Sequence, residues 1–229
     1  MTARVLQLAD QTLTYRLKRS DRRSIGLKIS RDGLTVTLPL RLPAVEADRA
    51  VRQKLDWIMA KLAEQAKQPA PAMGLSCGNP VLWLGEAVIL RTGSARSRIA
   101  GAELHLAASD HPEHITAKLA HFYQRSARPH FGARVQHWSG RMGLVPRRVA
   151  LSSARGRWGS CSATGGVRLN WRLMQAPPAV IDYVVIHELA HLAELNHSPR
   201  FWAIVEAHCP DWKTQRGWLK QHGGQLMGW

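Results

Sequence analysis

Hydrophobic residues recur along the chain with two different spacings, and each spacing predicts one kind of element. Near the N-terminus, apolar and polar residues partly alternate over residues 13–16, 24–30 and 34–38, which predicts three short strands. An Asp-Gly pair at residues 32–33 separates the last two and is typical of a tight hairpin. Residues 44–67 instead repeat apolar side chains at helical spacing, so we expect a helix there.

A stretch rich in proline, glycine and alanine, residues 68–80, follows this first group of elements. Such a composition is typical of a linker or a long loop. We therefore expect two domains. Residues 1–75 would form a small, basic, β-rich region with one helix, and residues 76–229 a larger second domain.

The larger region mixes strand and helix patterns, which predicts an α+β fold. A hairpin is expected at residues 81–91, a loop at 92–102, and one long helix, or two that break near Pro129, over 114–141. The remaining expected elements are two strands, 148–153 and 167–171, on either side of a glycine- and serine-rich turn, and three helices, 179–195, 201–208 and 211–220.

Charge is the unusual feature of the composition. Lysine and arginine total 32 against 16 aspartate and glutamate, a formal net charge of +16. A chain this basic attracts polyanions such as nucleic acid. A generally basic surface that recognises no nucleic-acid sequence explains the charge equally well. The three cysteines, Cys77, Cys161 and Cys209, are far apart and form no CxxC pair, which argues against a disulfide framework or a thiolate zinc cage.

The chain starts without an apolar run of signal-peptide length, and no stretch approaches the length of a membrane span. Together with the cysteine pattern, this predicts a cytoplasmic protein without a membrane partner.

The predicted helix 179–195 carries the motif HExxH, in which the histidines are His187 and His191. Residues four apart lie on one face of a helix, so both imidazoles can reach one metal ion. Glu188 is rotated by one residue and can reach a water on that metal, as a general base must. Zinc suits nitrogen ligands and an open fourth position, so we expect Zn²⁺.

A catalytic zinc needs a third protein ligand, and His197 is the favoured candidate because it follows the end of the helix directly. Its six-residue interval from His191 equals that in the metzincin motif HExxHxxGxxH. The glycine of that motif is Glu194 here and no Met-turn follows, so this chain does not fit the metzincin pattern. Glu194, Glu206 and His208 stay open as alternatives for the third ligand.

Several segments in combination resemble the YgjP-like family of predicted metal-dependent hydrolases, which is related to the SprT-like and WLM zincin proteases. They are RWGSC at residues 157–161, LN at 169–170, IDYVVIHELAH at 181–191 and NHSPRFW at 196–202, with RR at 22–23 and WI at 57–58 in the basic N-terminal region. The resemblance is densest over residues 148–219 and covers most of the chain.

This resemblance implies a zincin-like catalytic domain with His187, His191 and His197 as zinc ligands and Glu188 as catalytic base. The segment His-Ser-Pro-x-Phe is similar to the His-Gly-Pro-x-Phe segment that supplies the third ligand in SprT-like proteins, with Ser198 in place of the glycine. In zincins the strand before the active helix often forms the edge of the cleft. We therefore expect the strand that ends at Asn170 to pair with an extended peptide.

We predict a zinc metallopeptidase that cleaves peptide bonds with a Glu-activated water. Trp158, Asn170 and Tyr183 are candidates for contacts with a peptide or protein substrate, and a purely structural role fits them equally well. Two other functions stay open: a basic nucleic-acid-binding module with a structural zinc, and an amidohydrolase that acts on a non-peptide substrate.

Overall fold

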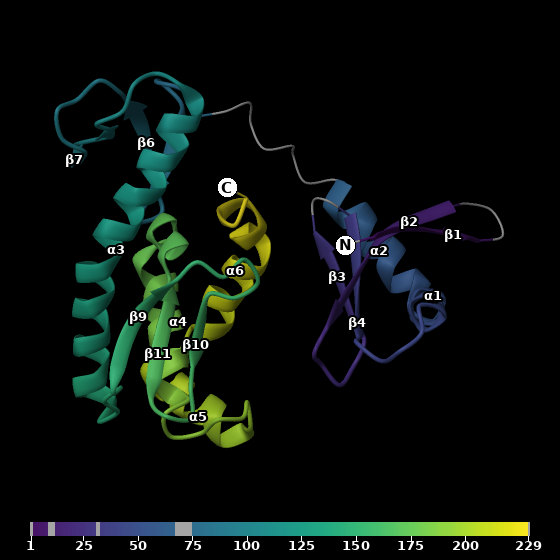
Figure 1. The fold of residues 1–229 in the computed structure, drawn as a ribbon. Coiled ribbons are helices and arrows are strands. Elements are labelled where there is room, and N and C mark those ends of the chain that lie inside the picture. The colour runs from purple at the N-terminus through teal and green to yellow at the C-terminus, as the bar shows by residue number, and fades with distance from the viewer. Residues whose placement is uncertain (1, 9–11, 31–32, 67–74, 229) are drawn as a thin grey trace. The chain divides into compact units, whose positions relative to one another are not determined.

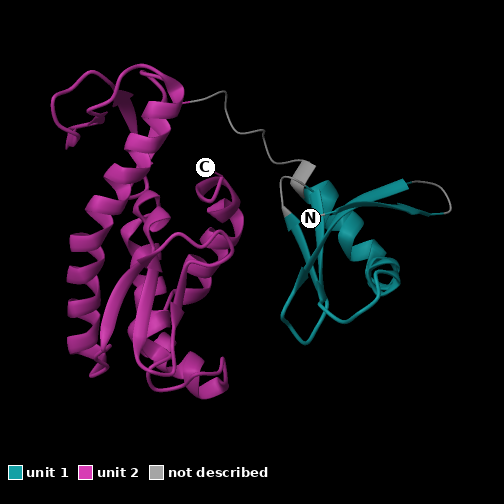
Figure 2. Cartoon of the chain, viewed as in Figure 1, with its two compact units in different colours: residues 1–70 teal, residues 71–229 magenta. Residues whose placement is uncertain are grey.

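The computed structural model describes residues 2–8, 12–30, 33–66 and 75–228. The chain forms two compact units, residues 1–70 and residues 71–229 (Figure 2). The expected boundary between residues 75 and 76 lies close to this division and stays a prediction. Both units combine sheets with helices, as the predicted α+β class requires (Figure 1).

The first unit is a four-stranded sheet with two helices. Its strand order is β1-β2-β4-β3, with bounds β1 Thr2–Gln7, β2 Thr12–Ser20, β3 Gly26–Ser30 and β4 Gly33–Pro39. The strand β1 was not predicted, whereas β3 and β4 form the expected antiparallel pair with Ser30 opposite Gly33. The turn residues 31–32 lie outside the described residues.

The helix expected over residues 44–67 is two helices, α1 Val45–Gln53 and α2 Leu55–Ala66. Lys54 between them leaves helical geometry, with φ −114° and ψ 20°. Its N–H still donates to the carbonyl of Ala50, and its own carbonyl accepts from Ile58 at 2.9 Å, so hydrogen bonding continues across the kink. The apolar spacing therefore predicts helical structure in this segment correctly, but it does not predict the kink at Lys54.

The second unit begins with a small sheet of order β5-β6-β8-β7. The predicted hairpin is present as β5 Pro80–Trp83 and β6 Glu86–Arg91. The strand β7 Arg98–Ala100 lies within the segment expected to be a loop, and β8 Glu103–His105 follows that segment. The hairpin turn docks on the segment before the helix Pro178–Ala190, where the Leu84 N–H donates to the carbonyl of Met174 at 2.7 Å. Gly85 has φ 91° at this contact, and a Cβ there would lie 2.9 Å from Cα of Pro177, so only glycine fits.

A single long helix, α3 Pro112–Met142, runs through Pro129 without ending. An internal proline removes one backbone hydrogen bond and normally destabilises a helix. Here buried side chains lie on both sides of it, with Tyr123 and Ala127 before the proline and Phe131 and Val135 after it. Tertiary packing of these residues offsets the local loss, so the helix continues.

The centre of the second unit is a three-stranded sheet of order β10-β11-β9 packed on the helix α4. Figure 1 shows α3 on one side of α4 and α6 on the other. The elements are β9 Arg148–Ser152, β10 Gly159–Cys161, β11 Gly166–Asn170, the 3-10 helix η1 Trp171–Gln175, α4 Pro178–Ala190, α5 Pro199–His208 and α6 Trp212–Leu226.

The helix α4 is buried on most of its faces. Ile181, Val185 and Leu189 are fully buried, and neighbours on α3, α5, α6 and the sheet surround it. Within the described residues, none of the helices combines the length and the apolar character that crossing a bilayer requires.

Candidate metal centre

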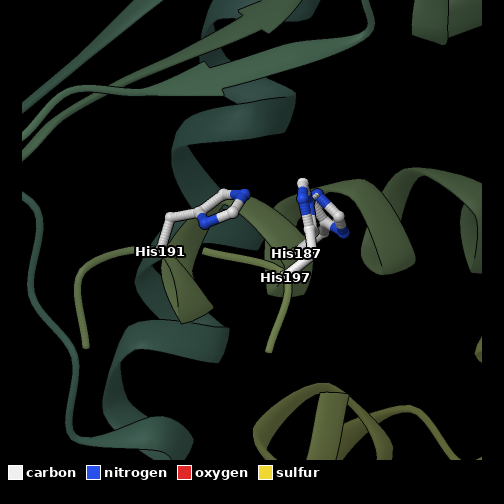
Figure 3. Close-up of side chains that lie close together, drawn as sticks. All are labelled: His187, His191 and His197. Atoms are coloured by element: carbon white, nitrogen blue, oxygen red, sulfur yellow. Dashed lines mark hydrogen bonds between the residues drawn. The ribbon is translucent and has the colours of Figure 1, made fainter. Parts of the chain in front are cut away.

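Two elements bring three histidines together. His187 lies in the last turn of α4, His191 caps the C-terminal end of that helix, and His197 lies in the loop that leads into α5. Ser198 fixes the start of α5, because its hydroxyl accepts a hydrogen bond from the N–H of Phe201 at 3.3 Å. This N-cap places His197 directly before the helix, facing the other two histidines (Figure 3).

The three side chains converge closely enough to share one ion. One ligand nitrogen from each histidine lies within 4.8 Å of the other two. Nε2 of His187 and Nε2 of His197 are 3.1 Å apart. Two nitrogens at zinc-ligand distance in a tetrahedral site would be separated by about 3.3 Å, so the spacing fits a shared zinc ion.

The protonation of the histidines also suits a metal. Burial, followed by the charges of His191, His197 and Arg216, lowers the pKa of His187 to about 3. Burial likewise lowers the pKa of His191, so both rings are neutral at pH 7 and offer a lone pair. Nδ1 of His191 donates to the carbonyl of Glu194 at 3.1 Å, which leaves Nε2 of that ring free to coordinate.

Phe201 supports all three imidazoles. Its ring is fully buried, and its centroid lies 4.9 Å from that of His187, 4.4 Å from that of His191 and 4.7 Å from that of His197. The ring of Trp202 also stacks on His197, at 5.7 Å between centroids. The aromatic residues of α5 therefore hold the histidine rings in their orientations.

Glu188 lies beside the histidines, on the side of α4 that faces β10. Its side chain is buried, and burial raises its pKa to about 7 while the charge of Arg157 opposes that rise. A Cβ placed on Gly159 would lie 2.4 Å from Oε1 of Glu188. The absence of a side chain at residue 159 therefore gives the carboxylate its space.

Glu188 and His187 open into a cleft of about 380 Å³ between β10, α4 and α6. Trp158 and Tyr183 line this cleft, and their contact with a substrate stays a prediction. Sequence reasoning missed the cationic residues of the cleft, which are Arg157, Arg216 and Lys220. The last two are four residues apart on α6, a spacing that predicts a shared face but does not say what that face meets.

Asn170 has a different environment from Trp158 and Tyr183. It is fully buried, and its Nδ2 donates to the carbonyl of Ala154 at 2.6 Å and to that of Arg157 at 3.0 Å. Its Oδ1 accepts from the N–H of Arg172 at 3.1 Å and so caps η1. These bonds fix the loop that carries Arg157 and Trp158, so the geometry gives Asn170 a structural role.

The expectation that the strand ending at Asn170 forms the edge of the cleft is wrong. That strand, β11, is the central strand of its sheet and is paired on both sides, with β10 and with β9. The strand beside Glu188 is β10, which lies at the edge of the sheet. Its three residues lie in a glycine- and serine-rich segment, whose composition predicts a turn rather than a strand.

The alternatives for the third ligand do not join the cluster. In the part of the chain that the structure describes, the group of converging ligand side chains is His187, His191 and His197, without Glu194, Glu206 or His208. Glu194 contributes through its backbone carbonyl, by orienting His191.

Comparison with known proteins gives a family and one solved structure. The family described as "YgjP-like, metallopeptidase domain" matches residues 23–222 of this chain. A similar solved structure is the metallopeptidase zymogen of Pyrococcus abyssi abylysin, at 22% identity and a TM-score of 0.37, with 40% of this chain and 93% of that chain covered. No curated protein matches the chain.

Proposed function

This chain belongs to the YgjP-like metallopeptidase family, and from that premise we propose that it hydrolyses peptide bonds with a zinc ion held by His187, His191 and His197. The observation that carries the proposal is the convergence of three imidazole nitrogens within 4.8 Å, beside a buried carboxylate that opens into the same cleft. Three histidine nitrogens that leave one coordination position open are the donor set of a catalytic zinc site.

A zinc ion bound there would supply a Lewis acid that lowers the pKa of a water molecule and polarises the scissile carbonyl. Glu188 accepts the proton of the attacking water and delivers it to the leaving amine. Its position against Gly159 keeps the carboxylate at the wall of the cleft, next to His187. Phe201 holds the three imidazoles in place, so the site does not depend on the substrate for its geometry.

The strand β10 offers a place for the substrate backbone. It is an edge strand of three residues, and its first residue, Gly159, lies against Glu188. An extended peptide can add to such an edge through main-chain hydrogen bonds, which would carry its scissile bond past the carboxylate. Trp158 and Tyr183, in the walls of the same cleft, would then contact substrate side chains.

Two substitutions test this proposal on purified protein. Glu188→Gln keeps all three histidines, so it should bind zinc at the stoichiometry of the wild type and lose at least about a hundredfold in peptide hydrolysis. His197→Ala should lose zinc as well as activity, because two protein ligands hold the ion poorly. Metal content is measured by mass spectrometry and hydrolysis with a fluorogenic peptide mixture.

A second candidate function rests on the net charge of +16, which favours a nucleic-acid-binding module with a structural zinc. If Glu188→Gln retained every measurable activity, the carboxylate would not be the base and this second function would be preferred. Hydrolysis of a non-peptide amide by wild type, with no cleavage of peptides, would support an amidohydrolase instead. Location in the cytoplasm stays a prediction.

A further inference from the structure

A second cavity, of about 450 Å³, lies on the outer face of the sheet β10-β11-β9. Val167 and Leu169 of β11 point into the core, so Arg168 between them points away from it. The pairing register places Ala150 of β9 and Ser160 of β10 on either side of Arg168. Small side chains thus form the floor of the cavity, and longer ones rise around it.

Four arginines line this cavity: Arg147, Arg148, Arg157 and Arg168, which we call the arginine face. All four side chains are exposed, and no acidic residue lines the cavity. Across the described residues, no carboxylate forms an ion pair with any of the four guanidinium groups. Arg157 also lies near the Glu188 carboxylate of the neighbouring cleft, whereas Arg147, Arg148 and Arg168 have no ion-pair partner among the described carboxylates. Cations gathered in this way would bind an anionic group from outside the chain.

The arginine face adjoins the catalytic cleft across the strand β10. Arg157 lines both cavities, Gly159 lines the cleft, and Ser160 and Cys161 line the arginine face. Successive side chains of an extended peptide point to opposite faces of a sheet, about 3.3 Å further along for each residue. A peptide added to β10 would therefore place one side chain in the cleft and its neighbour toward the arginines.

We propose that the arginine face is a substrate subsite for carboxylate side chains, so that the chain prefers acidic polypeptides. The inference rests on the proposed peptidase function and names its substrate class. A guanidinium group binds a carboxylate through paired hydrogen bonds. Several guanidinium groups around one cavity would attract an acidic side chain and fix the register of its peptide along β10. Arg216 and Lys220 extend the positive charge into the catalytic cleft itself, where Glu188 is the sole acidic residue among the described lining residues.

Cleavage of matched peptides tests the preference. A peptide that the wild type cleaves is made in two forms, with either Glu or Gln beside the side chain that enters the cleft. We expect kcat/KM for the Glu form to exceed that for the Gln form by about tenfold, because a hydrogen bond to a charged group stabilises the complex by about that factor. In Arg148→Gln/Arg168→Gln this ratio should fall to near one. In the control Arg96→Gln/Arg98→Gln, which removes two exposed arginines from another surface, the ratio should not change.

Binding separates this inference from the proposed function. The same two peptides, labelled with fluorescein, are titrated with the Glu188→Gln protein and followed by anisotropy. Tighter binding of the Glu form, lost in Arg148→Gln/Arg168→Gln, supports the subsite even if no peptide is hydrolysed. Equal binding of the two forms overturns it, even if the enzyme proves to be a peptidase.

A nucleic acid is the competing occupant, because phosphates also pair with arginine. A labelled single-stranded oligonucleotide is therefore measured with the same variants. The loss of binding in Arg148→Gln/Arg168→Gln is compared with that in Arg96→Gln/Arg98→Gln for each ligand. If this excess loss is larger for the oligonucleotide than for the Glu peptide, the arginine face is a nucleic-acid site and the proposal fails. An equal, small effect of both double variants on the oligonucleotide is the expected result.

Discussion

Gly159 and Glu188 lie so close together that residue 159 controls the position of the carboxylate. Three atoms of the Glu188 side chain lie within 2.7 Å of the place that a Cβ on Gly159 would occupy. Gly159→Ala should therefore push the carboxylate aside and lower kcat by at least about tenfold, while the three histidines still bind zinc. Steady-state hydrolysis and metal content of the purified variant measure the two effects.

Gly156→Ala is the matched control for this substitution. Residue 156 lies in the loop that leads into β10, is exposed, and has no atom within 4 Å of a new Cβ, so Gly156→Ala should retain wild-type activity. Unchanged hydrolysis by Gly159→Ala would mean that Glu188 is not held against β10.

At the same scale, the candidate metal residues could be predicted from the sequence because their chemistry is local. His187 and His191 are four apart on one helix, and His197 follows shortly after it. Arg157 and Arg216 could not be predicted, because they approach the cleft from a loop and from α6, and only tertiary packing joins those segments. The same is true of Phe201, whose spacing indicates a core position and whose contact with three imidazoles does not show in the sequence.

The helix α3 carries a proline that packing tolerates. Pro129 is exposed in the middle of 31 helical residues, so its ring makes no core contact that alanine would lose. Pro129→Ala should restore a backbone hydrogen bond and raise the free energy of unfolding by about 1–3 kcal/mol. Urea denaturation measures the change.

Lys118→Ala serves as comparison, since Lys118 is another exposed position of α3 and should change stability by less than about 0.5 kcal/mol. Equal effects of the two substitutions would mean that the helix already compensates for the proline in full.

Next to this proline, α3 and α4 meet at a titratable group. Arg134 of α3 holds Asp182 of α4 through two bonds, at 2.6 and 2.7 Å, and His130 lies one turn before Arg134. Burial, and then the charge of Arg134, lower the pKa of His130, whereas Asp182 raises it. The net shift is downward, so the folded state prefers the neutral ring.

Since the pKa of His130 is lower in the folded state, the unfolded state binds more protons below its ordinary value of 6.5. The stability that this group contributes is fully present above pH 6.5 and is lost as the pH falls toward the folded pKa. His130→Phe removes the titration, so its free energy of unfolding should fall less steeply than that of the wild type below pH 6.5. Denaturation of both proteins in metal-free buffers from about pH 7.5 to 5 compares the slopes, and parallel curves would refute the assignment.

Helical structure was predictable where apolar residues repeat at helical spacing over many residues, as in the segment of α1 and α2. The strand β10 was missed because three residues in a glycine- and serine-rich segment carry no period, and its pairing with β11 is what makes it a strand. The strands β7 and β8 are equally short. The central position of β11 in its sheet could not be predicted either, since strand order depends on pairing between distant segments.

For the whole molecule, the net charge of +16 is the property that the sequence alone determines. Non-specific binding to a single-stranded oligonucleotide should therefore weaken by at least about tenfold between about 50 and 200 mM salt, because bound counterions are released. Glu188→Gln should follow the same salt dependence, since it leaves the basic surface intact. Fluorescence anisotropy measures both proteins, and binding that does not respond to salt would exclude a purely electrostatic attraction.

The bond from His191 to the carbonyl of Glu194 has a practical consequence for mutational studies. The acceptor belongs to the main chain, so exchanging the side chain at residue 194 leaves it in place. A scan of side-chain substitutions would score residue 194 as dispensable, even though its carbonyl fixes the tautomer of the candidate ligand His191. Inserting or deleting one residue between 191 and 194 would reveal the dependence that such a scan overlooks.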